Sequence, residues 1–124
     1  MAVRVLIIDD SRDGADSMQM VLDLKGYDTR VTYTGDDGLR VAADWCPDVV
    51  LCDLDMPGVT GYDVAKTLRA CPGVSHTRLI AVSGYGQDED RQRCRDAGFD
   101  AFLVKPVEWP ELERILAGTR RDVG

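Results

Sequence analysis

The chain has 124 residues, a length that suits one domain with a single hydrophobic core. Hydrophobic residues make up 44% and charged residues 30%, the balance of a globular protein, and no apolar run approaches the ~20 residues of a membrane span. The net charge of −7 argues against nucleic acid or an anionic membrane as a direct partner, and it agrees with a site that collects cations.

Strands and helices are expected to alternate along the whole chain. Apolar, β-branched runs predict strands over residues 3–8, 27–33, 49–52, 78–83 and 99–104. Apolar residues at helical spacing predict helices over residues 11–25, 34–46, 61–71, 88–97 and 110–116. This alternation, with short loops, predicts an α/β sandwich in which right-handed crossovers connect a parallel sheet that is covered on both sides.

Local signals set several helix ends. Ser11 is expected to cap the first helix, and Gly26 to end it. The second helix is expected to end before Pro47, because the residue that precedes a proline avoids the helical conformation. The helix residues expected to pack on the sheet are Met18, Val21, Leu22, Leu39, Val41, Ala42 or Ala43, Val64, Ala65, Leu68, Leu112, Ile115 and Leu116.

The cysteines show no metal-binding or disulfide pattern. Cys46, Cys52, Cys71 and Cys94 are scattered, and we expect them to be reduced and mostly buried. The only histidine, His76, lies in a loop and is expected to be solvated, so neither a zinc site nor a histidine-based catalyst is indicated. The N-terminal residues do not have the pattern of a signal peptide, and we expect a cytoplasmic protein.

Four predicted strands end in polar residues, namely Asp9 and Asp10, Asp53, Ser83, and Lys105. In a parallel sheet the carboxyl ends of the strands lie at one edge, so these side chains are expected to converge. Three carboxylates at close range repel one another, and a hard divalent cation such as Mg²⁺ relieves this repulsion. Lys105 and Ser83 would supply the positive charge and the hydroxyl donor that a phosphoryl group requires.

The third of these strands ends most abruptly. Residues 49–52 form an apolar run that is typical of a strand buried on both faces, and Asp53 follows it directly. Pro57 and Gly58 then break any regular structure, and Asp55 could offer its backbone carbonyl to a metal. A carboxylate in this position can act as a nucleophile and form an aspartyl phosphate.

The motifs resemble those of the receiver domain of two-component response regulators. They are residues 5–10, residues 53–58 with Gly61, residues 83–84, and residues 97–98 through Phe102 to 105–106. The resemblance covers residues 3–118, within a single domain of 1–124. It implies a doubly wound, flavodoxin-like (βα)5 sandwich, whose five-stranded parallel sheet has the order 2-1-3-4-5.

The resemblance also implies a role for each strand-end residue. Asp53 would be the phosphoacceptor, and Lys105 would contact the phosphoryl group. Asp10 and Asp53 would bind Mg²⁺ together with the backbone carbonyl of Asp55, whereas Asp9 would act mostly through water. Mn²⁺ or Ca²⁺ are expected to be able to replace Mg²⁺.

The resemblance further implies a switch, in which Ser83 is the hydroxyl and Phe102 the aromatic. Phosphorylation would then change the surface formed by residues 88–97, the fifth strand and the last helix, which is also the surface through which a homodimer would form. Phe102 lacks the hydroxyl of a tyrosine, so the ring is expected to favour an inward position; simple core packing is the alternative role. The Lys105–Pro106 bond is expected to be cis, and Tyr85 and Asp55 are expected to tune the phosphoryl lifetime.

The expected partner is a sensor histidine kinase or a histidine phosphotransfer protein. Its phosphohistidine would dock beside the first helix, where Met20 and Leu24 lie off the buried face. The domain would be a signalling module that is not an enzyme, except for its own phosphorylation and dephosphorylation. It would act either as a free-standing regulator or as the receiver of a hybrid histidine kinase, and the downstream effector is open.

Three alternatives remain. An aspartate-nucleophile phosphatase would also carry the D-x-D of residues 53–55, but the acidic pair would follow it rather than precede it. A flavin carrier of the same topology is disfavoured, because Asp9 and Asp10 would repel the flavin phosphate. A pseudo-receiver, an interaction module that works without phosphorylation, is the third alternative, although all the groups that phosphorylation needs are present.

Overall fold

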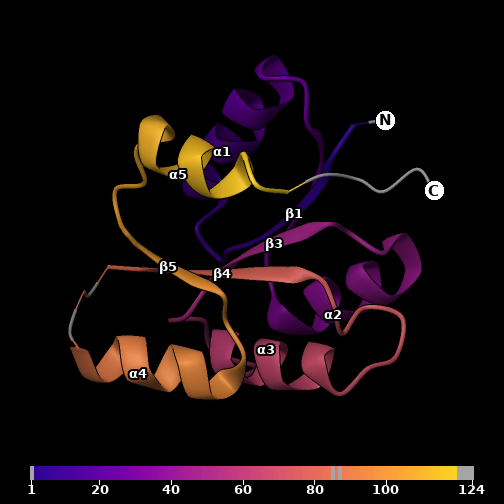
Figure 1. Ribbon diagram of the computed structural model, residues 1–124, viewed down its shortest axis with the longest axis vertical. Coiled ribbons are helices and arrows are strands. Elements are labelled where there is room, and N and C mark those ends of the chain that lie inside the picture. The colour runs from indigo at the N-terminus through magenta and orange to yellow at the C-terminus, as the bar shows by residue number, and fades with distance from the viewer. Residues whose placement is uncertain (1, 85, 87, 120–124) are drawn as a thin grey trace.

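The computed structural model describes residues 2–84, 86 and 88–119 of the chain. Within these residues, five parallel strands form one sheet in the order β2-β1-β3-β4-β5, and five helices cover its two faces (Figure 1). The strands are β1 (Arg4–Ile8), β2 (Asp28–Thr32), β3 (Val49–Asp53), β4 (Arg78–Ser83) and β5 (Ala101–Val104). The helices are α1 (Arg12–Leu24), α2 (Gly35–Trp45), α3 (Gly61–Arg69), α4 (Asp88–Ala97) and α5 (Trp109–Leu116). The predicted fold class and strand order are confirmed.

The sheet separates two hydrophobic cores. Figure 1 shows α1 and α5 on one face of the sheet, and α2, α3 and α4 on the other. Alternate residues of β1 feed the two cores: Val5 and Ile7 pack with α1 and α5, whereas Leu6 and Ile8 pack with the other layer. All residues of β3 are buried, which confirms the expectation of a central strand covered on both faces.

The predicted helix ends are largely confirmed. The Ser11 hydroxyl accepts a hydrogen bond from the Gly14 N–H at 3.4 Å, and Gly26 follows α1 with a φ of 93°, which favours glycine. Helix α2 ends before Pro47, as expected, because Cys46 leaves the helical conformation for a left-handed one with a φ of 52°. All the cysteines are free, and Cys46 at this helix end is exposed.

Two details of the prediction are wrong. Strand β5 begins at Ala101 rather than at residue 99, because the Phe99 N–H bonds the Cys94 carbonyl at 3.0 Å and so closes the last turn of α4. Val21 was expected to pack on the sheet, but it is 39% exposed, because it lines a groove between α1 and α5. In α2 it is Ala42, not Ala43, that is buried.

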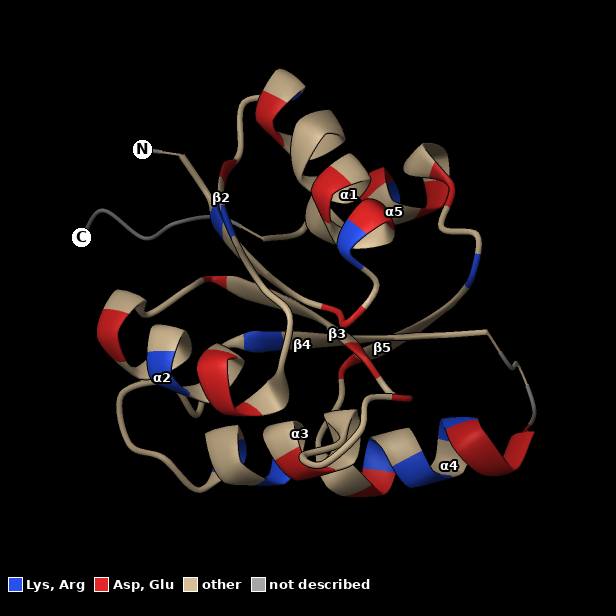
Figure 2. Cartoon of the chain, turned by 180° about the vertical axis from the view of Figure 1, so that it is seen from behind, with Lys and Arg blue, Asp and Glu red and all other residues tan. Residues whose placement is uncertain are grey.

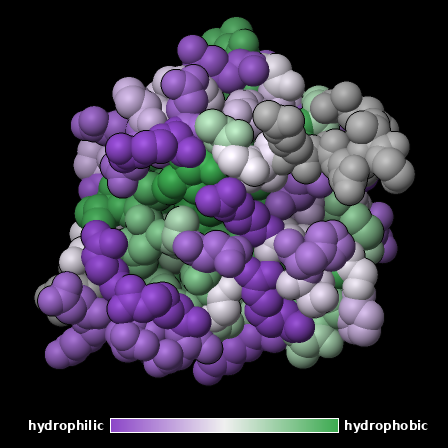
Figure 3. Space-filling view, in the orientation of Figure 1, coloured by the Kyte–Doolittle hydropathy of each residue, from purple (hydrophilic) through white to green (hydrophobic). Residues whose placement is uncertain are grey.

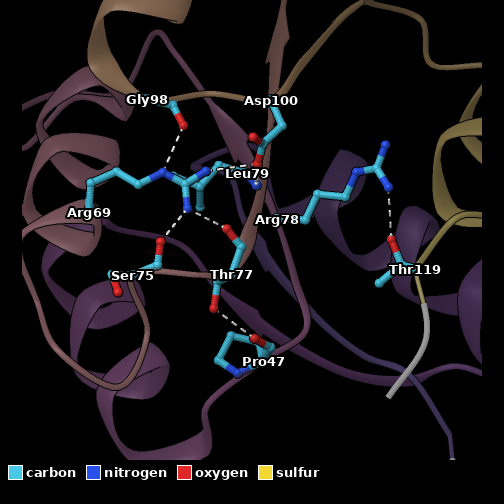
Figure 4. Close-up of polar contacts among 9 residues, drawn as sticks. All are labelled: Pro47, Arg69, Ser75, Thr77, Arg78, Leu79, Gly98, Asp100 and Thr119. Carbon is cyan, nitrogen blue, oxygen red and sulfur yellow. Dashed lines mark hydrogen bonds and ion pairs between the residues drawn. The ribbon is translucent and has the colours of Figure 1, made fainter. Parts of the chain in front are cut away.

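Arg69, at the end of α3, ties together the loops at the amino edge of the sheet (Figure 4). Its guanidinium donates hydrogen bonds to the carbonyls of Gly98, Ser75 and Thr77, at 2.6–2.9 Å, and to the Asp100 carboxylate at 2.7 Å. Nothing in the local sequence pattern predicted this network. It fixes the turn between α4 and β5 at the end of the sheet opposite to the strand-end acids.

Among the residues that the structure describes, no helix is both long and apolar enough to cross a bilayer. His76 is exposed, as the sequence predicted for a loop residue.

Candidate functional site

Three acidic side chains meet at the carboxyl edge of the sheet. Asp9 and Asp10 directly follow β1, Asp53 ends β3, and the two strands are neighbours in the sheet, with Ile8 opposite Cys52. Each of the three carboxylates offers an oxygen within 4.8 Å of the others. Figure 2 shows acidic segments of the chain between the two helix layers, near the middle of the sheet. The expected convergence of strand ends therefore exists in the structure.

Asp53 is the most enclosed of these acids. It is 4% exposed, whereas Asp9 is half-buried and Asp10 is exposed. The Asp55 backbone N–H donates to Asp53 Oδ1 at 3.2 Å, and the Ser11 N–H donates to Asp9 Oδ1 at 2.9 Å. These backbone contacts orient both carboxylates, so the buried Asp53 faces the more exposed acids.

Lys105 neutralises part of this charge. Its Nζ lies 3.4 Å from Asp53 Oδ2 and 3.5 Å from Asp9 Oδ2, so a single ammonium bridges the acids that follow two different strands. Partial burial acts to lower the pKa of Lys105, but the carboxylates of Asp53 and Asp9 outweigh this and raise the pKa. The lysine therefore stays charged, and it can also contact an anion that binds at Asp53.

The environment of Asp53 disfavours its ionised form. The pKa of this carboxyl is raised from 3.8 to about 6. Burial is the main cause and the nearby Asp9 adds to it, whereas the Asp55 N–H and Lys105 act to lower the pKa. A bound cation would therefore stabilise the ionised form of Asp53, which burial and the nearby acids disfavour.

Gly61, one of the residues of the resemblance, lies against the backbone of Asp53. A Cβ at this position would lie 2.5 Å from the Asp53 carbonyl oxygen, which no side chain tolerates without a shift of the backbone. The glycine lets the start of α3 approach the end of β3 and so holds the loop that contains Asp55 close to the acids.

Ser83 and Phe102 lie on the face of the sheet that α4 covers. In the register of β3 and β4 Asp53 is opposite Val82, so Ser83 is the next residue along, and it is 2% exposed. Phe102 is opposite Ala81 and packs, half-buried, on the core under α4. The guanidinium of Arg91 lies 4.7 Å from the centroid of the Phe102 ring. This cation–π contact was missed at the level of sequence, because it joins a helix to a strand.

Two further expectations concern the surroundings of the site. The Lys105–Pro106 bond is cis, as the resemblance implied. Met20 is 66% and Leu24 81% exposed on α1, which confirms that they lie off its buried face. Tyr85 lies outside the described residues.

The acidic cluster fits a hard divalent cation. Its potential ligands are all carboxylate oxygens, with no nitrogen or sulfur ligand among them, and their mutual distances suit a shared ion. Mg²⁺ prefers such oxygen ligands and usually keeps several waters, for which the exposure of Asp10 leaves room.

A family model of the response regulator receiver domain matches residues 5–117. The chain therefore belongs to this family, the receiver domains of two-component signalling. Among curated proteins it is 30% identical over 112 residues to the polar-differentiation response regulator DivK of Brucella ovis, a match that covers 90% of this chain and 91% of DivK. It is 34% identical over 112 residues to the virulence sensor protein BvgS of Bordetella pertussis, covering 86% of this chain but 9% of BvgS.

Solved structures agree with this membership. The chemotaxis protein CheY4 of Vibrio cholerae superposes with a TM-score of 0.91 at 25% identity, covering 97% of this chain and 100% of that chain. The receiver domain of the sensor histidine kinase PA1611 of Pseudomonas aeruginosa has a TM-score of 0.87 at 26% identity, covering 95% of this chain and 97% of that chain. That structure carries a magnesium ion coordinated in its active-site cleft.

Proposed function

We propose that the chain is a phosphoacceptor that takes a phosphoryl group from a phosphohistidine onto Asp53. The observation that supports this most strongly is the meeting of a buried carboxylate, two further acids and one ammonium at the sheet edge. An oxygen of Asp53 attacks phosphorus, the bond between phosphorus and the imidazole nitrogen breaks, and its electron pair stays on that nitrogen. Lys105 moves from its contact with Asp53 to the oxygens of the transferred group.

Asp10 and Asp53 would hold Mg²⁺ directly, together with the backbone carbonyl of Asp55, and Asp9 would act through water. When bound there, Mg²⁺ would neutralise charge on the phosphoryl oxygens during transfer. The chain's own contribution is to fix the acids: the N–H groups of Ser11 and Asp55 orient Asp9 and Asp53 before any ligand arrives.

The response to phosphorylation would pass through Ser83 to the face of the sheet under α4. The new negative charge on Asp53 draws the Ser83 hydroxyl, and the space behind Ser83 is then open to the ring of Phe102 on the adjacent strand. Arg91 opposes this inward movement, because the ring would leave the guanidinium that covers it. The surface of α4, β5 and α5 would thus change on phosphorylation.

The donor would be a sensor histidine kinase or a histidine phosphotransfer protein that docks beside α1. The exposed side chains of Met20 and Leu24 supply apolar contact area there, in the half of α1 that lies away from the site. Replacing Met20 with Glu should slow phosphotransfer from the protein donor while leaving uptake from acetyl phosphate intact. Equal transfer rates for the two forms would count against this docking surface.

The proposal is tested by incubating the chain with acetyl phosphate, with and without Mg²⁺, and separating phosphorylated from free protein. Acid-stable but alkali-labile phosphate should appear only with Mg²⁺ and should be absent in Asp53→Asn. A pseudo-receiver would take up no phosphate under either condition. Uptake that persists in Asp53→Asn would show that another residue is the acceptor.

A further inference from the structure

A groove of about 560 Å³ runs between α1 and α5 and reaches the candidate site. Its walls are apolar along most of their length, with Met18 and Val21 on α1, and Trp109 and Leu112 on α5. At one end it is lined by Asp53, together with Asp9, Ser11 and Lys105. The volume is that of a small-molecule pocket, whose ligand would be polar at one end and apolar along its length.

The groove exists because α1 presents small side chains toward α5. Gly14 and Ser17 lie in its wall one helical turn apart, where larger residues would fill the gap between the two helices. Val21, one turn further along, is therefore left 39% exposed. From Ser11 to Val21 the groove follows α1 for roughly 15 Å, at the rise of 1.5 Å per helical residue. On the face seen in Figure 3, apolar side chains also reach the surface between the hydrophilic surfaces of the two helix layers.

The polar end of the groove determines which head group its ligand would carry. Asp53 is the nucleophile in the proposed function, and Lys105 beside it attracts a phosphoryl group. A ligand with a phosphoryl head here and an aliphatic chain along α1 would match both ends of the groove. An acyl phosphate has this structure, and its phosphoryl group is activated for transfer to a carboxylate.

We propose that this groove binds the acyl chain of an acyl phosphate. The protein would then accept a phosphoryl group from medium-chain acyl phosphates in preference to acetyl phosphate. The proposal rests on the proposed phosphoacceptor role of Asp53. In the transfer an Asp53 oxygen forms a bond to phosphorus, the bond between phosphorus and the acyl oxygen breaks, and the electron pair leaves with the fatty carboxylate. The released carboxylate then dissociates from the groove together with its chain.

The test compares octanoyl phosphate with acetyl phosphate as donors, below the micellar concentration, in the presence of Mg²⁺. Each buried methylene group favours binding by a few-fold, so kcat/KM should be at least about tenfold higher for octanoyl phosphate. Ser17→Phe, which places a ring in the groove, should remove this preference without lowering the rate with acetyl phosphate. Glu113→Phe, on the outer side of α5 and outside the groove lining, should keep the preference.

Binding is measured separately by NMR with octanoate, the unreactive product. The methyl signals of Met18, Val21 and Leu112 should shift, and the shifts should be lost in Ser17→Phe. If that variant does not fold, the shifts of Met18 and Leu112 should be lost in Val21→Trp. Equal kcat/KM for the two donors, a preference that survives in Ser17→Phe, or octanoate that leaves these signals unmoved would overturn the proposal. If the protein took up phosphate from neither donor, the phosphoacceptor role would be refuted instead. The NMR shifts caused by octanoate would then still test whether the groove binds an acyl chain.

Discussion

Replacing Asp53 with Asn should stabilise the metal-free protein at neutral pH. The pKa of Asp53 is raised from 3.8 to about 6, so the proton binds more tightly to the folded than to the unfolded chain. Ionisation therefore lowers stability as the pH rises from 3.8 to about 6, and the whole cost applies above that range. The pKa of Asp53 differs by ~2 between the folded and unfolded states, and each pKa unit corresponds to about 1.4 kcal/mol. Ionised Asp53 therefore lowers the free energy of unfolding by about 3 kcal/mol, a loss that does not occur with Asn.

This prediction is checked by urea unfolding of both proteins in EDTA, at about pH 7.5 and about pH 4. The variant should be more stable by about 2–3 kcal/mol at the higher pH, and by about 0.5 kcal/mol or less at the lower pH. Added Mg²⁺ should narrow the gap at the higher pH, because it stabilises only the wild type by binding the folded state. Asp44→Asn, the same substitution at an exposed position in α2, is the matched control. A variant that is less stable, or a gap of equal size at both pH values, would refute the electrostatic reasoning.

Three further substitutions test separate parts of the structure. Lys105→Gln removes the ammonium from the acidic cluster, so the affinity for Mg²⁺ in a fluorescence titration should rise. Phosphorylation by acetyl phosphate should become slower. Weaker Mg²⁺ binding would contradict this reasoning. Arg91→Ala removes the cation from the ring of Phe102, a contact of about 0.5–1 kcal/mol, and ¹⁹F NMR of a fluorinated ring should show a larger inward population. Arg69→Met should cost about 2–4 kcal/mol in urea unfolding, because partly buried carbonyls lose a charged donor. Arg40→Met, at an exposed ion pair, should cost about 0.5 kcal/mol or less.

The part of the site that lies at strand ends could be predicted from the sequence. Apolar, β-branched runs and helices of period 3.6 alternate so regularly that a parallel sheet is the expected result, and its carboxyl ends must share one edge. The approach of Asp9, Asp10 and Asp53 also requires that β1 and β3 are neighbours in the sheet. The order of the strands came from the resemblance, since periodicity does not say which strands are neighbours.

Contacts between distant segments could not be predicted in this way. Arg91 and Phe102 meet across a helix and a strand, and Arg69 bonds loops about thirty residues away, so no local pattern marks either contact. Val21 fits the inner face of α1 by periodicity, yet it lines the open groove between α1 and α5 and is therefore left partly exposed. The start of β5 was misplaced for a related reason, since Phe99 is as apolar as a strand residue but closes α4.

The claim on which the whole account depends is that the acids at the sheet edge turn Asp53 into the acceptor. The most direct measurement is reduction of the phosphorylated protein with borohydride, which converts an aspartyl phosphate into homoserine, followed by peptide mass spectrometry. We predict homoserine at position 53, only after incubation with acetyl phosphate and Mg²⁺. Homoserine at any other aspartate, or none at all under these conditions, would contradict the account.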